Sequence, residues 1–284
     1  MNNTLTRIVV AVIFIPTILW VSYQGGWWLF GMIFLFTLLA IIEFLVNEGF
    51  NQKDFLFWLS LLTVSILFVN GSGDDLRDLV SFDFLSNLQS LSTATVLVAY
   101  FLIGGMVLSV NTSEVQVLFN KQSRLLWGVI YVGLLYPNVL LVGRGFASHQ
   151  GGDFLLFLFG IIWLSDTAAM EIGKRWGKSK LSPSISPNKT VEGFVSGLIA
   201  AALTGILIHF WKFPEISIFH LLVISIGCSV FGQLGDLVES MWKRSLNIKD
   251  SSSIIPGHGG VLDRFDSLLF AAPFMYAYFK LVLA

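Results

Sequence analysis

The residues of this sequence that are best suited to chemistry gather between Gly232 and Asp266. Acidic, basic and glycine residues alternate there in an otherwise apolar chain. The charged members are Asp236, Glu239, Lys243, Arg244, Lys249, Asp250, Asp263, Arg264 and Asp266. Carboxylates without a cluster of cysteine or histidine favour a hard cation such as Mg²⁺, held together with substrate phosphates. Carboxylates beside lysine and arginine therefore indicate phosphoryl or nucleotidyl transfer.

The spacing of these residues predicts how helices present them. If the segment from Gly232 to Lys243 is helical, it places one or two carboxylates and a lysine on one face. Asp263 and Asp266, three residues apart, share a face at the start of the next helix in the same way. Between the two helices lies Pro256-Gly-His258-Gly259-Gly260, whose glycines permit positive φ and expose backbone N–H groups. We expect this turn to act as an anion cradle at a helix N-terminus.

The composition shows what kind of protein must position these residues. Only 12% of the 284 residues are charged, about half the share usual in soluble domains, while 55% are hydrophobic. The formal net charge is −1. These values exclude an ordinary soluble enzyme, a disordered chain and a basic nucleic-acid-binding protein, so no nucleic-acid partner is expected. A polytopic membrane protein remains.

Nine apolar segments have roughly the length that a helix needs to cross a bilayer. The expected spans are Ile8–Tyr23, Trp27–Val46, Phe55–Val69, Ala94–Val110, Leu125–Val142, Phe154–Ile172, Val191–Trp211, His220–Val238 and Ser267–Ala284. The sequence therefore predicts an all-α helical bundle, a single membrane domain over residues 1–284. Residues 1–150 supply N-terminal hydrophobic helices, and residues 151–284 supply the catalytic helices and loops.

The basic residues predict the orientation of the bundle. Most of the 17 lysines and arginines fall on one side if the N-terminus faces the cytoplasm, so we expect N-in and C-out. Acidic residues inside spans are costly and indicate function by default. Glu43 is the only one in the first five spans, and both a structural hydrogen bond and a functional role remain open for it.

Two stretches of the C-terminal half resemble a known family. The first reads Ser240-x2-Lys243-Arg244-x4-Lys249-Asp250-x5-Pro256-x-His258-Gly259-Gly260-x2-Asp263-Arg264-x-Asp266. The second comprises Asp166-Thr167, Gly173, Gly177-Lys178 and Ser186-Pro187-x-Lys189-Thr190-x-Glu192-Gly193. Together they resemble the CDP-diacylglycerol synthases, or phosphatidate cytidylyltransferases, which are also polytopic. The chain departs from the family pattern at Met170-Glu171, where a tyrosine is common, and at Asn188, where a second lysine is common.

The resemblance implies that phosphatidate and CTP react to give CDP-diacylglycerol and pyrophosphate, with Mg²⁺ required. On this hypothesis Asp236, Asp263 and Asp266 hold the metal, and a second cation stays an open alternative because three carboxylates repel one another. The predicted catalytic residues are Lys249, Asp250, His258 and Arg264. The predicted phosphate-binding residues are Lys189, Lys243, Arg244, Gly259 and Gly260. Membrane lipids surround the enzyme, the bacterial cytoplasmic membrane is the expected location with the site facing the cytoplasm, and a homodimer stays open.

Three other functions compete with this interpretation. A CDP-alcohol phosphotransferase has an Asp-Gly-x2-Ala-Arg motif upstream of aspartates spaced four apart, whereas this chain lacks that motif and has Gly260-x2-Asp263-x2-Asp266. A CTP-dependent polyprenol or phytol kinase remains as an alternative. An ion-coupled transporter is the rival from a different class. Transporters often have charged residues in corresponding spans of both halves, whereas the acidic residues of this chain's spans lie almost wholly in the C-terminal half.

Overall fold

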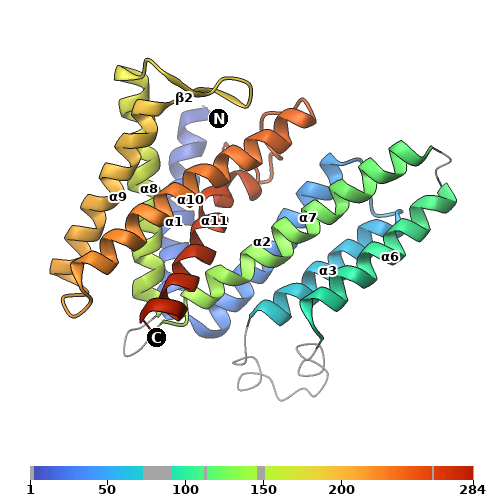
Figure 1. The fold of residues 1–284 in the computed structure, drawn as a ribbon, viewed down its shortest axis with the longest axis horizontal. Helices are drawn as coiled ribbons and strands as arrows, with labels where there is room; N and C mark the ends of the chain where they lie inside the picture. The colour runs from blue at the N-terminus through green and yellow to red at the C-terminus, as the bar shows by residue number, and fades with distance from the viewer. Residues whose placement is uncertain (1–2, 73–90, 112–113, 146–150, 258, 284) are drawn as a thin grey trace.

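The computed structural model describes residues 3–72, 91–111, 114–145, 151–257 and 259–283 (Figure 1). The described residues form nine α-helices and one short antiparallel hairpin. The helices are α1 (Asn3–Gln24), α2 (Gly26–Asn47), α3 (Phe55–Gly71), α6 (Thr93–Asn111), α7 (Val115–Val142), α8 (Gly151–Trp176), α9 (Val191–Trp211), α10 (Ile218–Ser245) and α11 (Leu262–Tyr278). The strands are β1 (Lys180–Ser182) and β2 (Ser186–Thr190), and a π-helical turn (Phe279–Leu283) continues α11.

Seven of these helices are long and apolar enough to cross a membrane, and two shorter apolar helices, Val10–Gln24 and Phe55–Gly71, accompany them in the described part of the chain. Each of the nine predicted spans coincides with a helix. The prediction of an all-α polytopic membrane bundle is therefore confirmed.

Several helices are longer at one end than the hydropathy predicted, among them α7, α10 and α11. α7 begins at Val115 rather than Leu125, α10 continues to Ser245 rather than Val238, and α11 begins at Leu262 rather than Ser267. Hydropathy detects only the part of a helix that lies in hydrocarbon, whereas the backbone hydrogen bonds continue where polar side chains begin. As a result, the charged ends of α10 and α11 lie on helices rather than in loops.

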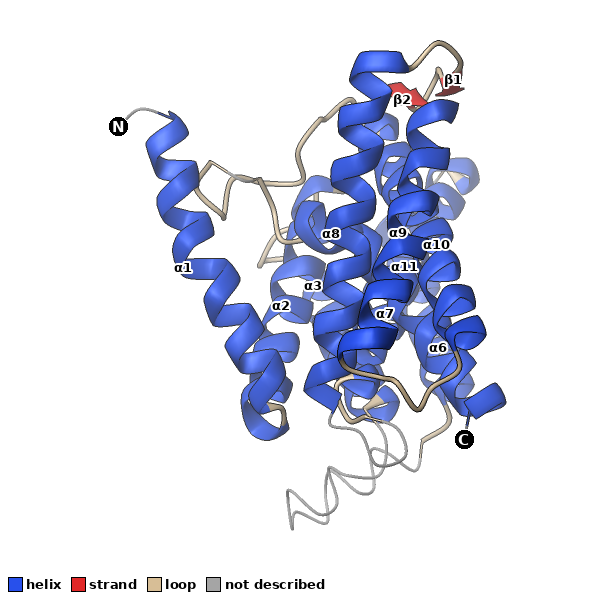
Figure 2. Ribbon diagram, turned by 90° about the vertical axis from the view of Figure 1, so that its left-hand side faces the viewer, coloured by secondary structure: helices blue, strands red, loops and turns tan. Residues whose placement is uncertain are grey.

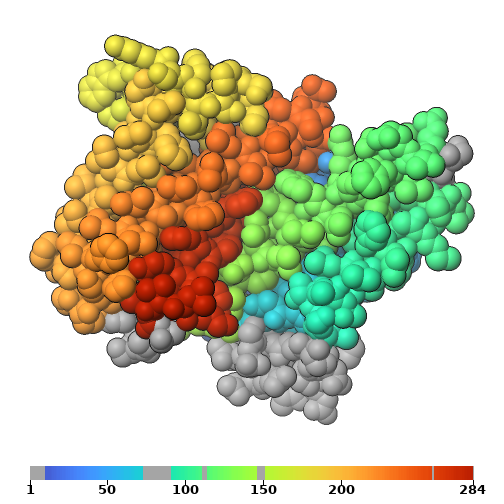
Figure 3. Space-filling model, viewed as in Figure 1, coloured from blue at the N-terminus to red at the C-terminus, as the bar shows by residue number. Residues whose placement is uncertain are grey.

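The helices form two groups that meet along α7 and α11. One group holds α8, α9, α10 and α11 in sequential contact, with α1 packed on α8, and the other holds α2, α3, α6 and α7. Figure 3 shows the same division on the surface, where the C-terminal helices occupy one part of the face and α6 and α7 the other. The β1–β2 hairpin lies at the same end of the bundle as the start of α1 (Figure 2). This end carries the polar residues singled out in the sequence.

A close helix contact between α2 and α7 supports the end that carries the site. A Cβ atom added at Gly128 of α7 would meet the ring of Phe44, which is fully buried. That ring stacks on Trp242 of α10 with 5.0 Å between ring centroids. Gly128 therefore allows α2 and α7 to approach closely, and the Phe44 ring held between them contacts Trp242 of α10.

We expect Gly128→Ala to lower the free energy of unfolding by about 1–3 kcal/mol, because the buried ring cannot move without disturbing its neighbours. Thermal unfolding in detergent measures the change. Gly31→Ala is the matched control, since a Cβ at this exposed position of α2 meets nothing within 4 Å. Equal midpoints for the two variants would contradict the packing argument.

Candidate active site

Three helices bring the acidic residues of the C-terminal half together at one end of the bundle. α8 contributes one of these carboxylates and α10 and α11 contribute two each: Asp166, Asp236, Glu239, Asp263 and Asp266. Asp236 and Asp166 lie close enough to Asp266 to repel it, and Glu239 lies close to both Asp263 and Asp266. Ser267 Oγ donates to Asp166 Oδ2 over 3.5 Å and so connects α11 with α8.

The predicted shared face of α10 is present. Ser240 Oγ donates to Asp236 Oδ1 over 3.2 Å, and Lys243 Nζ lies 3.2 Å from Glu239 Oε2. The Glu239 side chain is 0% exposed, and neither of its oxygens accepts a hydrogen bond from the described residues. Lys243 thus supplies the charge that offsets a fully buried carboxylate.

Asp263 has more partners than the other carboxylates of the cluster. Its Oδ1 accepts a 2.6 Å hydrogen bond from Lys243 Nζ. Its Oδ2 accepts from the backbone N–H of Ser251 and of Gly260, each over 2.8 Å, and Ser251 Oγ, whose single proton Glu43 can also accept, lies 3.0 Å from it. The carboxylate therefore organises the loop between α10 and α11 in addition to facing the cluster.

The glycine-rich turn has the positive φ values expected from its sequence. Gly257 has φ 75° and Gly259 φ 86°, and the N–H of Ile255 donates to the carbonyl of Gly259 over 3.0 Å. The N–H of Gly260 points to Asp263, so in this conformation it binds a carboxylate of the chain itself. His258, the predicted catalytic histidine of this turn, lies outside the described residues.

The β1–β2 hairpin brings Lys189 to the cluster. Its strands pair in an antiparallel register, and Lys189 Nζ lies 2.7 Å from Asp236 Oδ2. The next residue, Thr190, begins α9 as its N-cap and accepts a 3.1 Å hydrogen bond from the N–H of Gly193. Because the cap fixes where strand becomes helix, it also fixes the position of the lysine.

The remaining predicted residues make no hydrogen bond or ion pair with the five carboxylates among the described contacts. Lys249 and Asp250 are exposed and are not among the described residues that line the two cavities below. Arg244 donates to the carbonyls of Ile185 and Ile248 and so ties the end of α10 to the hairpin. Arg264 lines the first of the two cavities.

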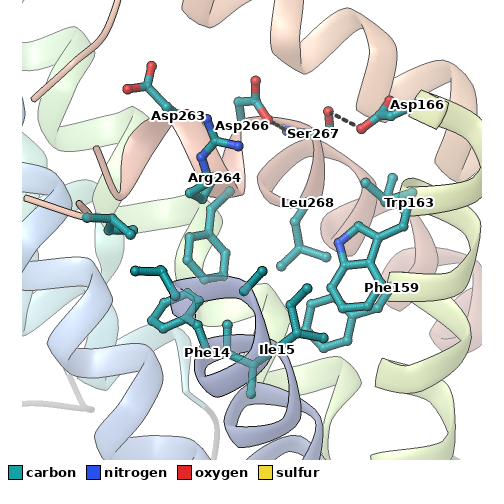
Figure 4. Close-up of a pocket in the computed structure, with 16 residues that line it drawn as sticks. Phe14, Ile15, Phe159, Trp163, Asp166, Asp263, Arg264, Asp266, Ser267 and Leu268 are labelled. Carbon is teal, nitrogen blue, oxygen red and sulfur yellow. Dashed lines mark hydrogen bonds between the residues drawn. The ribbon is translucent and has the colours of Figure 1, made fainter. Parts of the chain in front are cut away.

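Two cavities meet at the carboxylates. The first, about 270 Å³, lies between α1, α8 and α11 and is lined mainly by apolar residues. The second, about 390 Å³, lies between the hairpin, α8, α9, α10 and α11, and more of the residues that line it are polar or charged. Both are lined by Asp166, Asp263, Asp266 and Ser267. Figure 4 shows these four residues along one side of the first cavity, opposite the apolar side chains of Phe14, Ile15 and Phe159.

The donor set fits a hard divalent cation by its chemistry. The four aspartates line the second cavity and offer oxygen ligands to it. Among the described residues, only Lys189 and Lys243 form ion pairs with the five acidic side chains. The excess negative charge calls for a cation. The described residues contain no ready-made group of three acidic, histidine or cysteine side chains in metal-binding geometry. Mg²⁺ therefore stays a prediction.

Sequence reasoning left two residues of the site without a role. Asp166 lines both cavities, and Glu43 accepts four hydrogen bonds from the α10–α11 segment. The sequence did mark both residues as candidates, because each is an acidic residue within an apolar span. The partner of such a residue is set by helix packing, which one sequence does not show.

Comparison with known proteins decides the family. Residues 5–282 match the model of the family described as "Cytidylyltransferase family". The chain belongs to this family. It is 36% identical over 274 residues to the phosphatidate cytidylyltransferase of Staphylococcus haemolyticus (strain JCSC1435), an alignment that covers 96% of both chains. It is 34% identical over 273 residues to that of Staphylococcus aureus (strain COL), again covering 96% of both.

A third relative, the phosphatidate cytidylyltransferase of Bacillus subtilis (strain 168), is 37% identical over 221 residues, which cover 78% of this chain and 74% of the relative. The resemblance found in the two C-terminal stretches is therefore confirmed and extends to the N-terminal helices. As a member of the family, the chain is a nucleotidyltransferase with the architecture of an integral membrane protein.

Proposed function

We propose that this cytidylyltransferase family member is a CTP:phosphatidate cytidylyltransferase that makes CDP-diacylglycerol and pyrophosphate. The observation that carries the proposal is the meeting of two unlike cavities at one set of carboxylates. An apolar cavity between α1, α8 and α11 suits the glycerol and upper acyl chains of a lipid. The second cavity, lined by Lys189, Lys174 and other polar residues and here called the polar cavity, suits a nucleotide triphosphate. Two substrates held on either side of the carboxylates would bring their phosphates together.

The reaction requires one bond to form and one to break. A phosphate oxygen of phosphatidate forms a bond to the α-phosphorus of CTP, and the bond from this phosphorus to the bridging oxygen of the β-phosphate breaks. Pyrophosphate leaves with that oxygen. A phosphate monoester is already anionic, so this step needs no dedicated general base. Holding both phosphates in line is therefore the main task of the protein.

The side chains of the cluster would perform this positioning. Asp236, Asp263 and Asp266, with Asp166 beside them, would hold Mg²⁺, which supplies positive charge that offsets the negative charge on the phosphates. Lys189 pairs with Asp236 and Lys243 with Asp263, and from these positions both lysines can also bind phosphate oxygens. Arg264 lines the apolar cavity and is placed to bind the phosphate of the lipid.

We further propose that the site faces the cytoplasm of a bacterial cell membrane. The relatives named above are bacterial proteins, and the basic residues concentrate at the end of the bundle that carries the hairpin. CTP is a cytosolic metabolite, so this orientation gives it direct access to the polar cavity.

A labelling experiment tests the function. Purified protein receives phosphatidate, Mg²⁺ and CTP labelled on the α- or the γ-phosphorus. We expect α-label in the lipid product and γ-label in pyrophosphate. Transfer of γ-label to a lipid, with phytol or a polyprenol as acceptor, would instead identify a kinase. Absence of any label transfer, together with no thermal shift on adding CTP and Mg²⁺, would contradict both enzymatic functions.

A further inference from the structure

Glu43, near the end of α2, is joined to the catalytic half of the chain by an unusual number of contacts. The residue is only 2% exposed. Its Oε1 accepts from Ser252 Oγ over 2.6 Å and from the N–H of Val261 over 2.8 Å. Its Oε2 accepts from Ser251 Oγ and from the N–H of Leu262, each over 3.0 Å. All four donors belong to the loop and first turn that lead into α11.

Two of these donors are the backbone groups that begin α11. The first N–H groups of a helix lack partners within the helix, and a negative charge near them is favourable. The N-cap residue of α11 is Val261, and its side chain makes no hydrogen bond to these N–H groups. Glu43 therefore caps α11 from a different helix, more than 200 residues away in sequence.

The same contacts lead directly to Asp263. Ser251 Oγ lies 3.0 Å from Glu43 Oε2 and 3.0 Å from Asp263 Oδ2. A Cβ atom at Gly260 would meet both Ser251 Oγ and the carboxylate of Glu43. The next turn of α2 adds Asn47, whose Nδ2 donates to the carbonyl of Ser251 over 2.6 Å. The two carboxylates are thus held on opposite sides of one small loop.

We infer that Glu43 is a positioning residue, which holds Ser251 and the start of α11 so that Asp263 presents its carboxylate correctly to the substrates and cation. The inference rests on the proposed function and deepens it. It also gives the N-terminal half of the chain a defined part in the reaction. Glu43 is not among the residues that line the two cavities, and we infer that it acts through Ser251 and the start of α11, which carry Asp263.

The chemistry of the side chain explains why a carboxylate stands here. An ionised carboxylate has two oxygens that accept about four hydrogen bonds, and four donors are present. The amide of glutamine has the same shape, but its NH₂ group would face donors instead of accepting from them. Glu43→Gln therefore changes the hydrogen bonding without leaving a cavity.

The test uses the full-length protein in detergent with Glu43→Gln. We expect kcat to fall about 10–100-fold and the Mg²⁺ concentration for half-maximal rate to rise, as for partners that orient metal ligands. Mn²⁺ binding, followed by electron paramagnetic resonance without substrates, should weaken by a similar factor. Hydrogen exchange of the peptide covering residues 251–262 should become faster.

Glu48→Gln is the matched control. Glu48 lies at the same end of α2 as its C-cap residue. Its carboxylate accepts from Trp242 Nε1 over 2.9 Å and pairs with Arg124 rather than with the segment around Asp263. We expect this variant to lose stability while keeping its Mg²⁺ dependence, its Mn²⁺ affinity and its exchange over residues 251–262. Ser252→Ala removes one donor to Glu43 and one acceptor for the N–H of Ile254, but no hydrogen bond to Asp263. It should show the same changes as Glu43→Gln to a smaller degree.

The outcomes separate the inference from the proposed function. If Glu43→Gln lowers only the amount of folded protein and keeps wild-type kcat per folded molecule, Mg²⁺ dependence and Mn²⁺ affinity, the residue is merely structural and the inference is wrong. If Glu43→Gln does not fold, unchanged Mn²⁺ affinity and exchange in Ser252→Ala overturn it. A wild-type protein that forms no CDP-diacylglycerol contradicts the proposed function instead, and the Mn²⁺ and exchange measurements still decide the role of Glu43.

Discussion

Replacing Asp236 with asparagine is expected to lower the rate of CDP-diacylglycerol formation by about 10²–10³-fold. Its carboxylate lines the polar cavity and lies 2.7 Å from Lys189 Nζ. The substitution keeps the size of the side chain and removes the negative charge that would hold the cation against the phosphates. Product formation from labelled CTP at saturating Mg²⁺ measures the loss.

Asp153→Asn controls for the loss of an aspartate–lysine pair as such. Asp153 lies at the other end of α8, where Lys212 Nζ is 3.2 Å from its Oδ2. Because this pair is remote from both cavities, its removal should leave the rate within a few-fold of wild type. The assignment of Asp236 to the site would be wrong if the two variants had similar rates.

The second large effect is expected for Lys243→Met. The lysine side chain is 11% exposed and lies between Glu239, 0% exposed, and Asp263, 5% exposed. Removing one partner of a buried ion pair leaves an uncompensated charge, which costs about 3–5 kcal/mol. We expect the free energy of unfolding to fall by this amount, as measured by denaturant titration in mixed micelles, and the activity to fall with it.

Arg175→Met gives the scale for a solvent-exposed pair. The Arg175 and Glu171 side chains are 69% and 42% exposed, and pairs of this kind contribute at most about 1 kcal/mol. A loss of stability in Lys243→Met no larger than in Arg175→Met would show that Glu239 and Asp263 find other partners. Such a result would contradict the role of Lys243 as the cation that keeps this carboxylate cluster folded.

The apolar pattern was sufficient to predict the helical spans. All nine coincide with helices because a long apolar run has few other stable structures in a bilayer, where every backbone polar group must be paired. The errors lay at helix ends, as in α10, which continues to Ser245. Hydropathy carries no information where a helix leaves the hydrocarbon.

The local spacing also predicted the faces that α10 and α11 present. The Ser240 hydroxyl donates a hydrogen bond to Asp236, one helical turn earlier, because helical periodicity brings residues at this separation together. The spacing could not predict which distant groups would meet these faces. Lys189 was placed among the phosphate-binding residues from the sequence, but only the hairpin packing shows that it reaches Asp236.

The sequence by itself thus determined the membrane class, the helices and the family, because these depend on composition and on patterns that are local in the chain. The tertiary structure decided the partners of the buried charges. The sequence left open whether Glu43 has a structural or a functional role. In the fold, its carboxylate accepts hydrogen bonds from the backbone at the start of α11. The physical reason is that a buried carboxylate is unfavourable unless it accepts hydrogen bonds, and its donors can come from segments far away in the sequence. The local pattern of one sequence does not show which distant segments pack together.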